Sequence, residues 1–353
     1  MTKLDQYNSR KIARLSFVAA MLVVAIHNTY RINDFDALPS AFAWAQLAVH
    51  YGVTRVAVPF FFIVSGYFLF RDYDTSIAWW GGKLKKRAVT LGLPYLTWIV
   101  LGALEIALIN AVKAHPQEFF FWDDWSWWLE AVGITGGPLA MSNFWFVRIL
   151  IMAVLIAPVL GFATKTLGAV AVWSVFAFGV FLSGGLLNWF FVVLGAWIAI
   201  KGVPRLMQRS VKSRWCCVAI GVVWAALVAI RTYLAAKGTS LDKWVESPLV
   251  ATMNIAGVAF MWLIYDKFNM DKVMGWLDPV LKSAFFLYAA HPIVALARDC
   301  LLKPALYDQY SFAYVLTVLY GAYFAMVVIP VFVWWMLKRH APKVVRLCLF
   351  GDR

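Results

Sequence analysis

Apolar stretches long enough to cross a lipid bilayer recur along the whole of this chain. A helix rises about 1.5 Å per residue, so about 20 apolar residues cross the hydrocarbon core of a membrane. Inside that core every backbone N–H and C=O must be bonded within the protein, which favours helices. The chain is 63% hydrophobic and only 14% charged, too little charge for a soluble domain. We therefore predict an all-α polytopic membrane protein.

Ten spans are predicted, and no linker or repeat divides them, so residues 1–353 are expected to form one domain. The fifth and sixth spans are barely separated and could form a tight hairpin. The predicted spans cover residues 12–31, 50–70, 88–112, 144–163, 168–184, 186–200, 215–236, 249–265, 283–302 and 312–337.

The distribution of Lys and Arg predicts the orientation of the chain. With the amino terminus in the cytoplasm, the inner segments hold 23 of the 32 basic residues and the outer loops hold five. Basic residues are retained on the cytoplasmic side of membrane proteins. Both termini are therefore predicted to be cytoplasmic, with a carboxyl-terminal tail over about 338–353.

Two classes of partner are not expected. The formal net charge of +14 is explained by basic cytoplasmic loops, and no basic soluble domain is present to bind nucleic acid. The four cysteines show no spacing typical of a metal site or a disulfide framework. Neither a nucleic-acid partner nor a bound metal is predicted.

One histidine interrupts the first apolar stretch, Lys11–Arg31. His27 lies beyond the midpoint of this stretch, toward the outer face. A titratable group inside a membrane helix is costly, and it indicates a functional site by default. Neutral imidazole can accept a proton from a hydroxyl or amine, as a general base for acyl transfer must. The alternative is a histidine that is hydrogen-bonded between helices for packing.

Three further charged residues fall at a similar predicted depth in other spans. Arg55, Glu105 and Arg148 belong to the second, third and fourth spans. Unpaired charges at that depth are prohibitive, so these side chains must face one another or a wet cavity. A polar cavity that binds substrate would satisfy all of them together with His27. Structural ion pairing of Glu105 with an arginine is the alternative.

A second polar cluster is predicted nearer the cytoplasm. Ser65 and Tyr67 end the second span, and the run KLKKR, with Lys85, Lys86 and Arg87, precedes the third. Basic side chains at the start of a helix, beside the positive end of its dipole, suit a phosphate-bearing ligand. The alternative is a simple topology anchor, because every inner loop is basic.

The ninth span carries a second histidine in the sequence SAFFLYAAHPIV. Tyr288 and His291 are three residues apart and share a helix face. Pro292 removes a backbone donor and is expected to kink the helix. A kink beside a histidine indicates either the wall of a substrate cavity or a helix–helix contact.

The longest outer loop, about 113–143, is rich in aromatic residues, with the run FFFWDDWSWW. Its rings could stack on the faces of sugars. The favoured interpretation is an interfacial aromatic belt or a short amphipathic helix on the membrane surface.

Six stretches of the chain form an ordered set of motifs: VVAIHN, RVAVPFFFIVSGYFLF (55–70), KKRAVTLGLPYLTW (85–98), NFWFVRILIMAVLIAPVL (143–160), NWFFVVLGAWIA (188–199) and SAFFLYAAHPI (283–293). In these stretches the chain resembles the acyltransferase-3 family of integral membrane acyltransferases. They occur in the family's order and cover most of the chain. The VPFFFIVSGY and LYAAHP segments are the most specific.

The resemblance implies transfer of an acetyl or other short acyl group from cytoplasmic acyl-CoA to an extracytoplasmic glycan or lipid-linked saccharide. It implies His27 as the catalytic residue, and we expect a multi-pass protein of the bacterial inner membrane, in contact with its lipids. Family members usually carry an arginine eleven residues before the histidine, where it helps to hold acyl-CoA. This chain has Ser16 at that position, and Arg14 points about 140° away from the face of His27. Either another base, such as Arg87, serves in its place, or this chain is an atypical or inactive member.

A transporter or flippase for a lipid-linked sugar or small solute is the competing interpretation. Buried Arg, Glu and His residues in ten spans would fit such a carrier. Carriers often show two related halves with broken helices, which are not evident in this sequence. A membrane sensor module is a weaker alternative, because no soluble partner domain is apparent.

Overall fold

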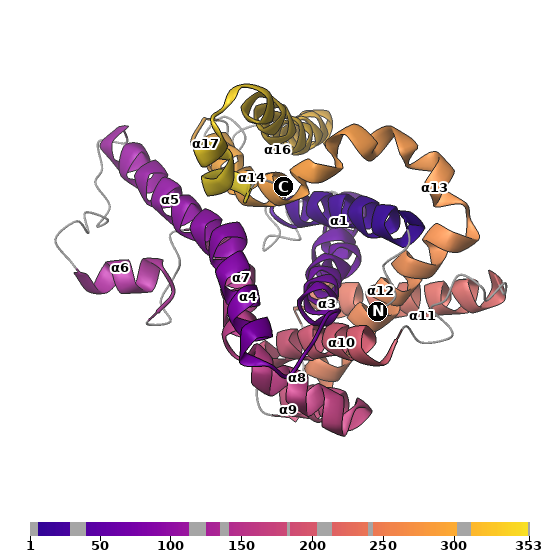
Figure 1. Cartoon of the computed structure of the whole chain (residues 1–353). Helices are drawn as coiled ribbons and strands as arrows, with labels where there is room; N and C mark the ends of the chain where they lie inside the picture. Colours follow the sequence, from indigo (N-terminus) through magenta and orange to yellow (C-terminus); the bar gives the residue numbers. More distant parts are fainter. Residues whose placement is uncertain are drawn as a thin grey trace.

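The computed structural model describes residues 6–28, 40–112, 125–134, 141–181, 184–202, 214–238, 243–301 and 312–351. These residues are almost entirely helical and include no strand (Figure 1). The longer helices are α1 (Gln6–Ile26), α3 (Ala57–Phe70), α4 (Ile77–Arg87), α5 (Leu93–Val112), α7 (Trp145–Leu155), α8 (Ala157–Leu167), α9 (Ala169–Phe181), α10 (Leu187–Lys201), α11 (Arg214–Ala236), α12 (Lys243–Lys267), α14 (Ala284–Leu301) and α16 (Phe312–His340). Shorter α-helices are α2 (Ser40–Leu47), α6 (Trp125–Ala131), α13 (Met270–Val273) and α17 (Lys343–Phe350). Two π-helical segments, η2 (Ala48–Gly52) and η4 (Ala88–Gly92), and four 3₁₀ segments, η3 (Val53–Val56), η5 (Ser142–Phe144), η6 (Gly184–Leu186) and η8 (Gly275–Ser283), connect the helices.

Several of these helices meet the requirements of a membrane span. By length and composition, five helical runs within the described residues could cross a bilayer, or six if a bent pair is one span. The five are Ala41–Phe70, Ile77–Glu105, Arg214–Ala236, Glu246–Lys267 and Tyr320–His340. The all-α polytopic membrane fold is thereby confirmed. The number of ten spans and the cytoplasmic position of both termini stay predictions.

Helix α1 occupies the middle of the bundle, with α3, α12, α14 and α16 around it (Figure 1). Its small and branched apolar side chains, such as Ala19, Ala20 and Val24, are completely buried. This packing explains why a helix with three basic residues near its start can still run through the centre of the fold. The surrounding helices therefore fix the position of α1, from its basic first turns to the end that precedes His27.

Helices α3 and α10 cross in close contact. A Cβ atom added at Gly66 would lie 2.2 Å from the carbonyl oxygen of Val192, and one at Gly195 would lie 2.1 Å from that of Ile63. Each helix thus contributes a glycine at the point where it crosses the backbone of the other. This contact positions Ser65, next to Gly66, on the inner side of α3.

The structure differs from the single continuous span predicted over 144–163. Helices α7 and α8 are bent by 72° with respect to each other. Pro158, near the start of α8, has no N–H to donate to the carbonyl of Val154 four residues earlier. The indole Nε1 of Trp80 on α4 donates to that carbonyl instead, at 3.1 Å. The bend therefore also ties α4 to α7.

The fifth and sixth predicted spans correspond to α9 and α10, which are short. They pack against each other, and the rings of Phe176 and Phe190 lie 5.1 Å apart. With 13 and 15 residues, each is about 20 Å long.

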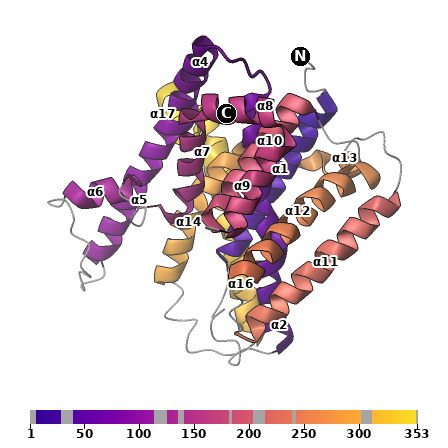
Figure 2. The same ribbon diagram turned by 90° about the horizontal axis from the view of Figure 1, so that it is seen from below.

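The segment predicted as a tail, 338–353, is largely helical. Helix α16 continues to His340, and the short helix α17 folds back onto α5. Phe350 is buried against Phe286, and the Trp98 indole donates to the carbonyl of Leu349 at 2.8 Å. The amino terminus with the start of α1, helix α4 and the carboxyl terminus lie at one end of the bundle, and α2 lies at the other (Figure 2). We call the end that holds the start of α1 the basic end.

Candidate functional site

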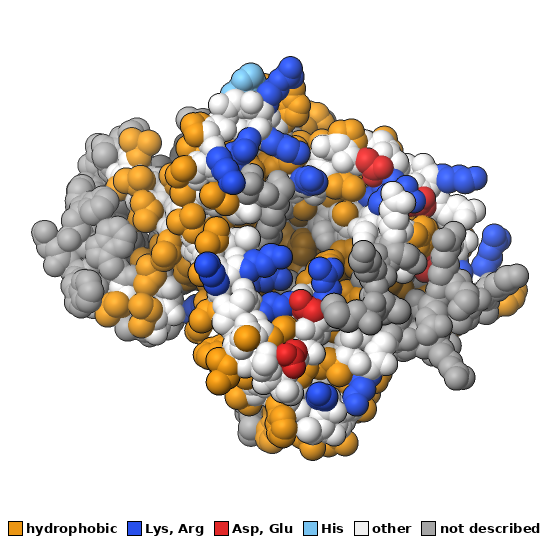
Figure 3. All heavy atoms as spheres, viewed as in Figure 1, with side chains coloured by type: hydrophobic (Ala, Val, Ile, Leu, Met, Phe, Trp, Pro, Cys, Tyr) orange, Lys and Arg blue, Asp and Glu red, His pale blue; other side chains and the backbone are white. Residues whose placement is uncertain are grey.

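A cavity of about 740 Å³ enters the bundle at the basic end. Its walls come from α1, α3, α4, η4, α7, α10, η8 and α14. Lys and Arg side chains gather over the middle of this face (Figure 3). The polar lining residues are Ser9, Ser16, Ser65, Arg71, Asp72, Lys83, Lys86, Arg87, Lys282 and Tyr288. The cavity combines a cationic mouth with an apolar interior.

Positive charge exceeds negative charge in the lining. The lining contains five cations and a single carboxylate, Asp72. Asp72 forms an ion pair with Lys83. Its partial burial would raise the pKa of Asp72, but the hydrogen bond and charge of Lys83 prevail and hold this pKa below its usual value. The remaining cations give the mouth a net positive field that favours an anionic ligand.

The basic run 83–87 lies within α4 rather than ahead of a span, and its members differ in position. Lys86 and Arg87 line the cavity, as the prediction of a phosphate-binding cluster requires, whereas Lys85 is exposed and is not among the lining residues. Helical periodicity places Lys85 on another face of α4. On α3, Ser65 lines the cavity, whereas Tyr67 does not.

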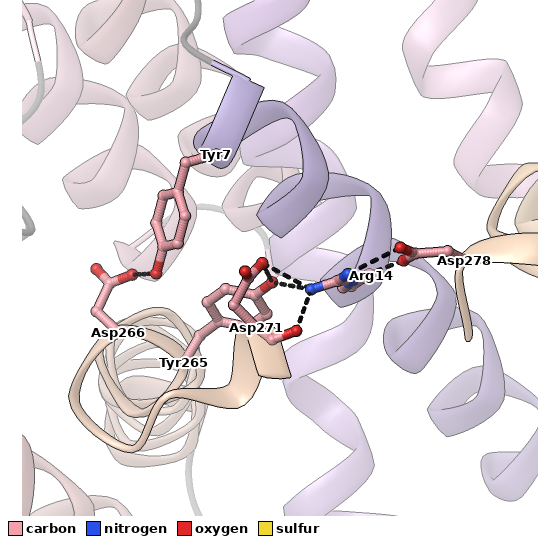
Figure 4. A network of polar contacts seen from close by, with 6 residues as sticks. All are labelled: Tyr7, Arg14, Tyr265, Asp266, Asp271 and Asp278. Carbon is pink, nitrogen blue, oxygen red and sulfur yellow. Dashed lines mark hydrogen bonds and ion pairs between the residues drawn. The ribbon is translucent and has the colours of Figure 1, made fainter. Parts of the chain in front are cut away.

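Ser16 and Arg14 face opposite environments on α1. Ser16 lines the cavity, whereas Arg14 is buried and points toward the segment that follows α12 (Figure 4). Its Nε and Nη2 donate to both carboxylate oxygens of Asp278, at 2.8 and 2.9 Å. Its Nη1 donates to the Asp271 carboxylate at 2.6 Å and to the Tyr265 hydroxyl at 3.0 Å. Arg14 is thus committed to structure, away from the cavity.

A second buried ion pair extends this network by one turn of α1. The Lys11 ammonium, fully buried, donates to Asp266 at 2.9 Å and lies 3.6 Å from the ring centre of Trp262. The Tyr7 hydroxyl also donates to Asp266, at 2.7 Å. We refer to Tyr7, Lys11, Arg14, Tyr265, Asp266, Asp271 and Asp278 together as the α1 anchor.

The inner wall of the cavity leads to the two histidines. Tyr288 lines the cavity and is 6% exposed, and its hydroxyl donates to the carbonyl of Asn143, whose side-chain amide donates back to the Tyr288 carbonyl at 2.8 Å. The ring centre of His291 lies 6.4 Å from that of Tyr288 and 5.2 Å from that of His27. The first and ninth predicted spans therefore bring their histidines together.

The two histidines have different surroundings. His27 follows the last residue of α1 and is exposed, whereas His291 is fully buried. The Arg298 guanidinium donates to the side chain of Asn28, the residue after His27, and the His50 ring is hydrogen-bonded to the carbonyl of Ile26, the residue before it. Arg55 is fixed by donation from Nε to the His50 carbonyl at 2.7 Å. His27 and Arg55, predicted to share a polar region, are brought together.

Arg148 and Glu105 are not brought to His27 by any contact among the described residues. Arg148 donates to the carbonyl of Gly133 at 3.3 Å and so supports the segment after α6. Glu105 lies on α5, which leans away from the rest of the bundle (Figure 2), and it forms no ion pair within the described ranges. Most of the aromatic loop, including residues 113–124 and 135–140, lies outside the described residues.

Sequence reasoning did not assign a role to Arg298 or Lys282. Arg298 follows His291 by seven residues, which is two helical turns, so a shared face was detectable from spacing. It donates to the Asn28 side chain at 2.8 Å, next to His27. Lys282 lies in η8, and only the folded chain brings it to the cavity.

These features can be compared with known proteins. A family model described as an acyltransferase domain matches residues 15–342, which include both histidines and all of the cavity lining except Ser9, Ile12 and Ala13. The chain belongs to the acyltransferase-3 family. This acyltransferase-3 protein is accordingly a multi-pass membrane acyltransferase.

Two curated proteins are similar to this acyltransferase-3 chain. The succinoglycan biosynthesis protein ExoH of Rhizobium meliloti (strain 1021) is 23% identical over 309 residues, which cover 80% of this chain and 79% of that protein. An amino-acid racemase of Enterococcus faecalis is 35% identical over 99 residues, which cover 28% of this chain but 13% of that protein. The second match spans too little of the racemase to bear on activity. No solved structure matches the chain.

Proposed function

We propose that the protein transfers an acetyl or other short acyl group from acyl-CoA, bound at the basic end, to a hydroxyl of a polysaccharide or lipid-linked saccharide. The observation that carries this proposal is the continuity along α1 between Ser16, in the wall of a cationic cavity, and His27 at the other end. Eleven residues of helix separate the two by roughly 16 Å. The basic end would face the cytoplasm of a bacterium, as the distribution of Lys and Arg predicts.

The cavity residues suit the donor. The phosphates of acyl-CoA would meet Arg71, Lys86, Arg87 and Lys282 at the mouth, where charge-assisted hydrogen bonds to phosphate are strong. The apolar lining beyond them, including Phe146, would take the acyl-bearing arm. Arg87 in particular would supply the positive charge that other family members carry at the position of Ser16.

His27 would act as the general base. It takes the proton of the acceptor hydroxyl while that oxygen forms a bond with the thioester carbonyl carbon. The C–S bond then breaks, and the leaving thiolate receives the proton, so His27 ends neutral. Arg55, beside His27 and firmly held, would orient the acceptor or stabilise the negative charge that develops on the carbonyl oxygen.

The similarity to ExoH supports a polysaccharide acceptor. ExoH is named for succinoglycan biosynthesis, and the match covers most of both chains. The exposed position of His27, at the end of the bundle opposite the basic end, would allow a large saccharide to approach.

Purified His27→Ala, with His340→Ala as the matched control, tests the proposal. We expect acyl transfer and CoA release to fall by about 10²- to 10⁴-fold in His27→Ala and to stay near the wild-type rate in His340→Ala, because His340 is exposed at the end of α16. Wild-type activity in a folded His27→Ala protein would refute the catalytic role. Saccharide flux through proteoliposomes without CoA release would indicate a carrier instead.

A further inference from the structure

The second histidine, His291, has a fixed orientation that the proposed reaction does not yet explain. Its Nδ1 lies 2.8 Å from the carbonyl oxygen of Tyr288 and 3.3 Å from that of Leu287. A carbonyl oxygen can only accept a hydrogen bond, so Nδ1 must carry the proton. In the neutral ring, Nε2 is then an acceptor with a lone pair.

This Nε2 atom is buried and has no hydrogen-bond partner among the described residues. Leaving a buried acceptor unsatisfied costs about 1–3 kcal/mol, so such an atom in a native fold calls for an explanation. His291 is 0% exposed, and protonating Nε2 would place a positive charge in that apolar site. The ring therefore stays neutral and can act only as an acceptor.

The neighbouring donor is His27. Two imidazole rings that share an N–H···N hydrogen bond of about 2.9 Å have their centres about 5 Å apart. The rings of His27 and His291 have their centres 5.2 Å apart, with an angle of 38° between their planes. No hydrogen bond joins the two rings in the structure, and rotation of the exposed His27 side chain would bring one of its nitrogens to Nε2 of His291.

Resting on the proposed function, we propose that His291 is a positioning residue whose neutral Nε2 accepts a hydrogen bond from one nitrogen of His27. That bond directs the other nitrogen, with its lone pair, at the acceptor hydroxyl. When His27 takes the proton, both of its nitrogens are protonated, and the bond to His291 becomes charge-assisted and stronger. His291 gains and loses no proton, and its role is to orient the base and stabilise its charged form.

Two substitutions separate this role from a purely structural one. Glutamine places a side-chain oxygen where Nε2 lies, so His291→Gln keeps the acceptor. Asparagine reaches only as far as Nδ1, so His291→Asn keeps the donor to the Tyr288 carbonyl and loses the acceptor. We expect kcat to fall by about 10- to 100-fold in His291→Asn and by less than about fivefold in His291→Gln.

The KM for acyl-CoA should change by less than about twofold in both variants, because His291 is not part of the cavity lining. The double variant His27→Ala/His291→Asn should be no slower than His27→Ala, since His291 acts through His27. A kcat for His291→Asn equal to or above that of His291→Gln would overturn the proposal. If His27→Ala were fully active, the proposed function itself would fail, so the two failures are distinguishable.

A measurement on the wild-type protein covers the case in which a variant does not fold. Nitrogen-15 NMR of histidine-labelled protein in lipid should show His291 protonated at Nδ1, with a hydrogen-bond coupling between its Nε2 and a nitrogen of His27. A His291 protonated at Nε2, or no coupling between the two rings, would contradict the assignment.

Discussion

The two ends of α1 show opposite treatments of polar side chains. At the basic end, the two cations of the α1 anchor, Lys11 and Arg14, are buried and paired with carboxylates, and Arg14 is bonded to two carboxylates and a tyrosine. At the other end, His27 is exposed and the Nε2 of His291 is buried without a partner among the described residues. The side chains of the anchor, whose hydrogen bonds and ion pairs are already made within the protein, hold α1 in place. The two histidines, which can still form hydrogen bonds, remain available to a substrate or a transferred proton.

This comparison predicts that substitutions at the anchor reduce stability, whereas substitutions near the histidines reduce turnover. The cavity between the two ends should respond in a third way, through ligand affinity. The predictions that follow test these three behaviours, beginning with the largest effect.

Removing the central cation of the anchor should destabilise the fold. Arg14→Met leaves buried bonding groups on Tyr265 and Asp271 without their donor, and we expect a loss of about 2–3 kcal/mol. This loss is at the low end of the range for breaking a buried ion pair, because the carboxylates of Asp271 and Asp278 are partly exposed. Arg10→Met, which removes the same charge from an exposed position on the same helix, is the control. Chemical unfolding in detergent measures the difference, and equal stability of the two variants would refute the assignment.

Removing a cation from the cavity should weaken donor binding without unfolding the protein. For Arg87→Gln we expect the KM for acyl-CoA to rise by about tenfold, the equivalent of one charge-assisted contact, with little change in kcat or melting temperature. Lys85→Gln is the matched control, because Lys85 belongs to the same basic run but lies outside the lining. Should both variants raise the KM equally, general surface charge rather than the cavity would be responsible.

Acid should weaken the anchor through Asp278. The hydrogen bond from Arg14 lowers the pKa of Asp278 below its usual 3.8, so the folded protein binds this proton less tightly than the unfolded chain. Its stabilising contribution is complete above the usual pKa and is lost as the pH falls through the lowered one. The melting temperature of the wild type should therefore drop more between pH 6 and pH 3 than that of Asp278→Asn. If the melting temperatures of the two proteins fell equally with pH, this role of Asp278 would be refuted. The expected change is smaller than those for Arg14→Met and Arg87→Gln.

The sequence was most informative about elements that depend on local pattern. Apolar runs of bilayer length predicted the helices, and the basic run with Lys86 and Arg87 predicted a charged cluster that the cavity contains. It was harder to predict which residues of one helix face the cavity and which face away from it. Lys85 and Tyr67 lie one position from lining residues and do not line the cavity, because a shift of one residue turns a helical side chain by about 100°.

Features that depend on contacts between distant segments were beyond reach. Arg14 has partners more than 250 positions away, and nothing in the pattern of α1 indicates which carboxylates it meets. The same holds for the contact between His27 and His291, each of which was predicted alone. The bend at Pro158 was not predicted for a related reason. The Val154 carbonyl, which Pro158 cannot bond, accepts a hydrogen bond from the indole of Trp80 on another helix.

The crossing of α3 and α10 has a consequence for how much room the donor has. Gly66 and Gly195 each meet a carbonyl of the opposite helix where even a methyl group has no space. Because Ser65, Gly66 and Val192 line the cavity, adding one carbon at either glycine would push a wall of the cavity aside. The two glycines therefore set how closely α3 and α10 approach each other beside the cavity.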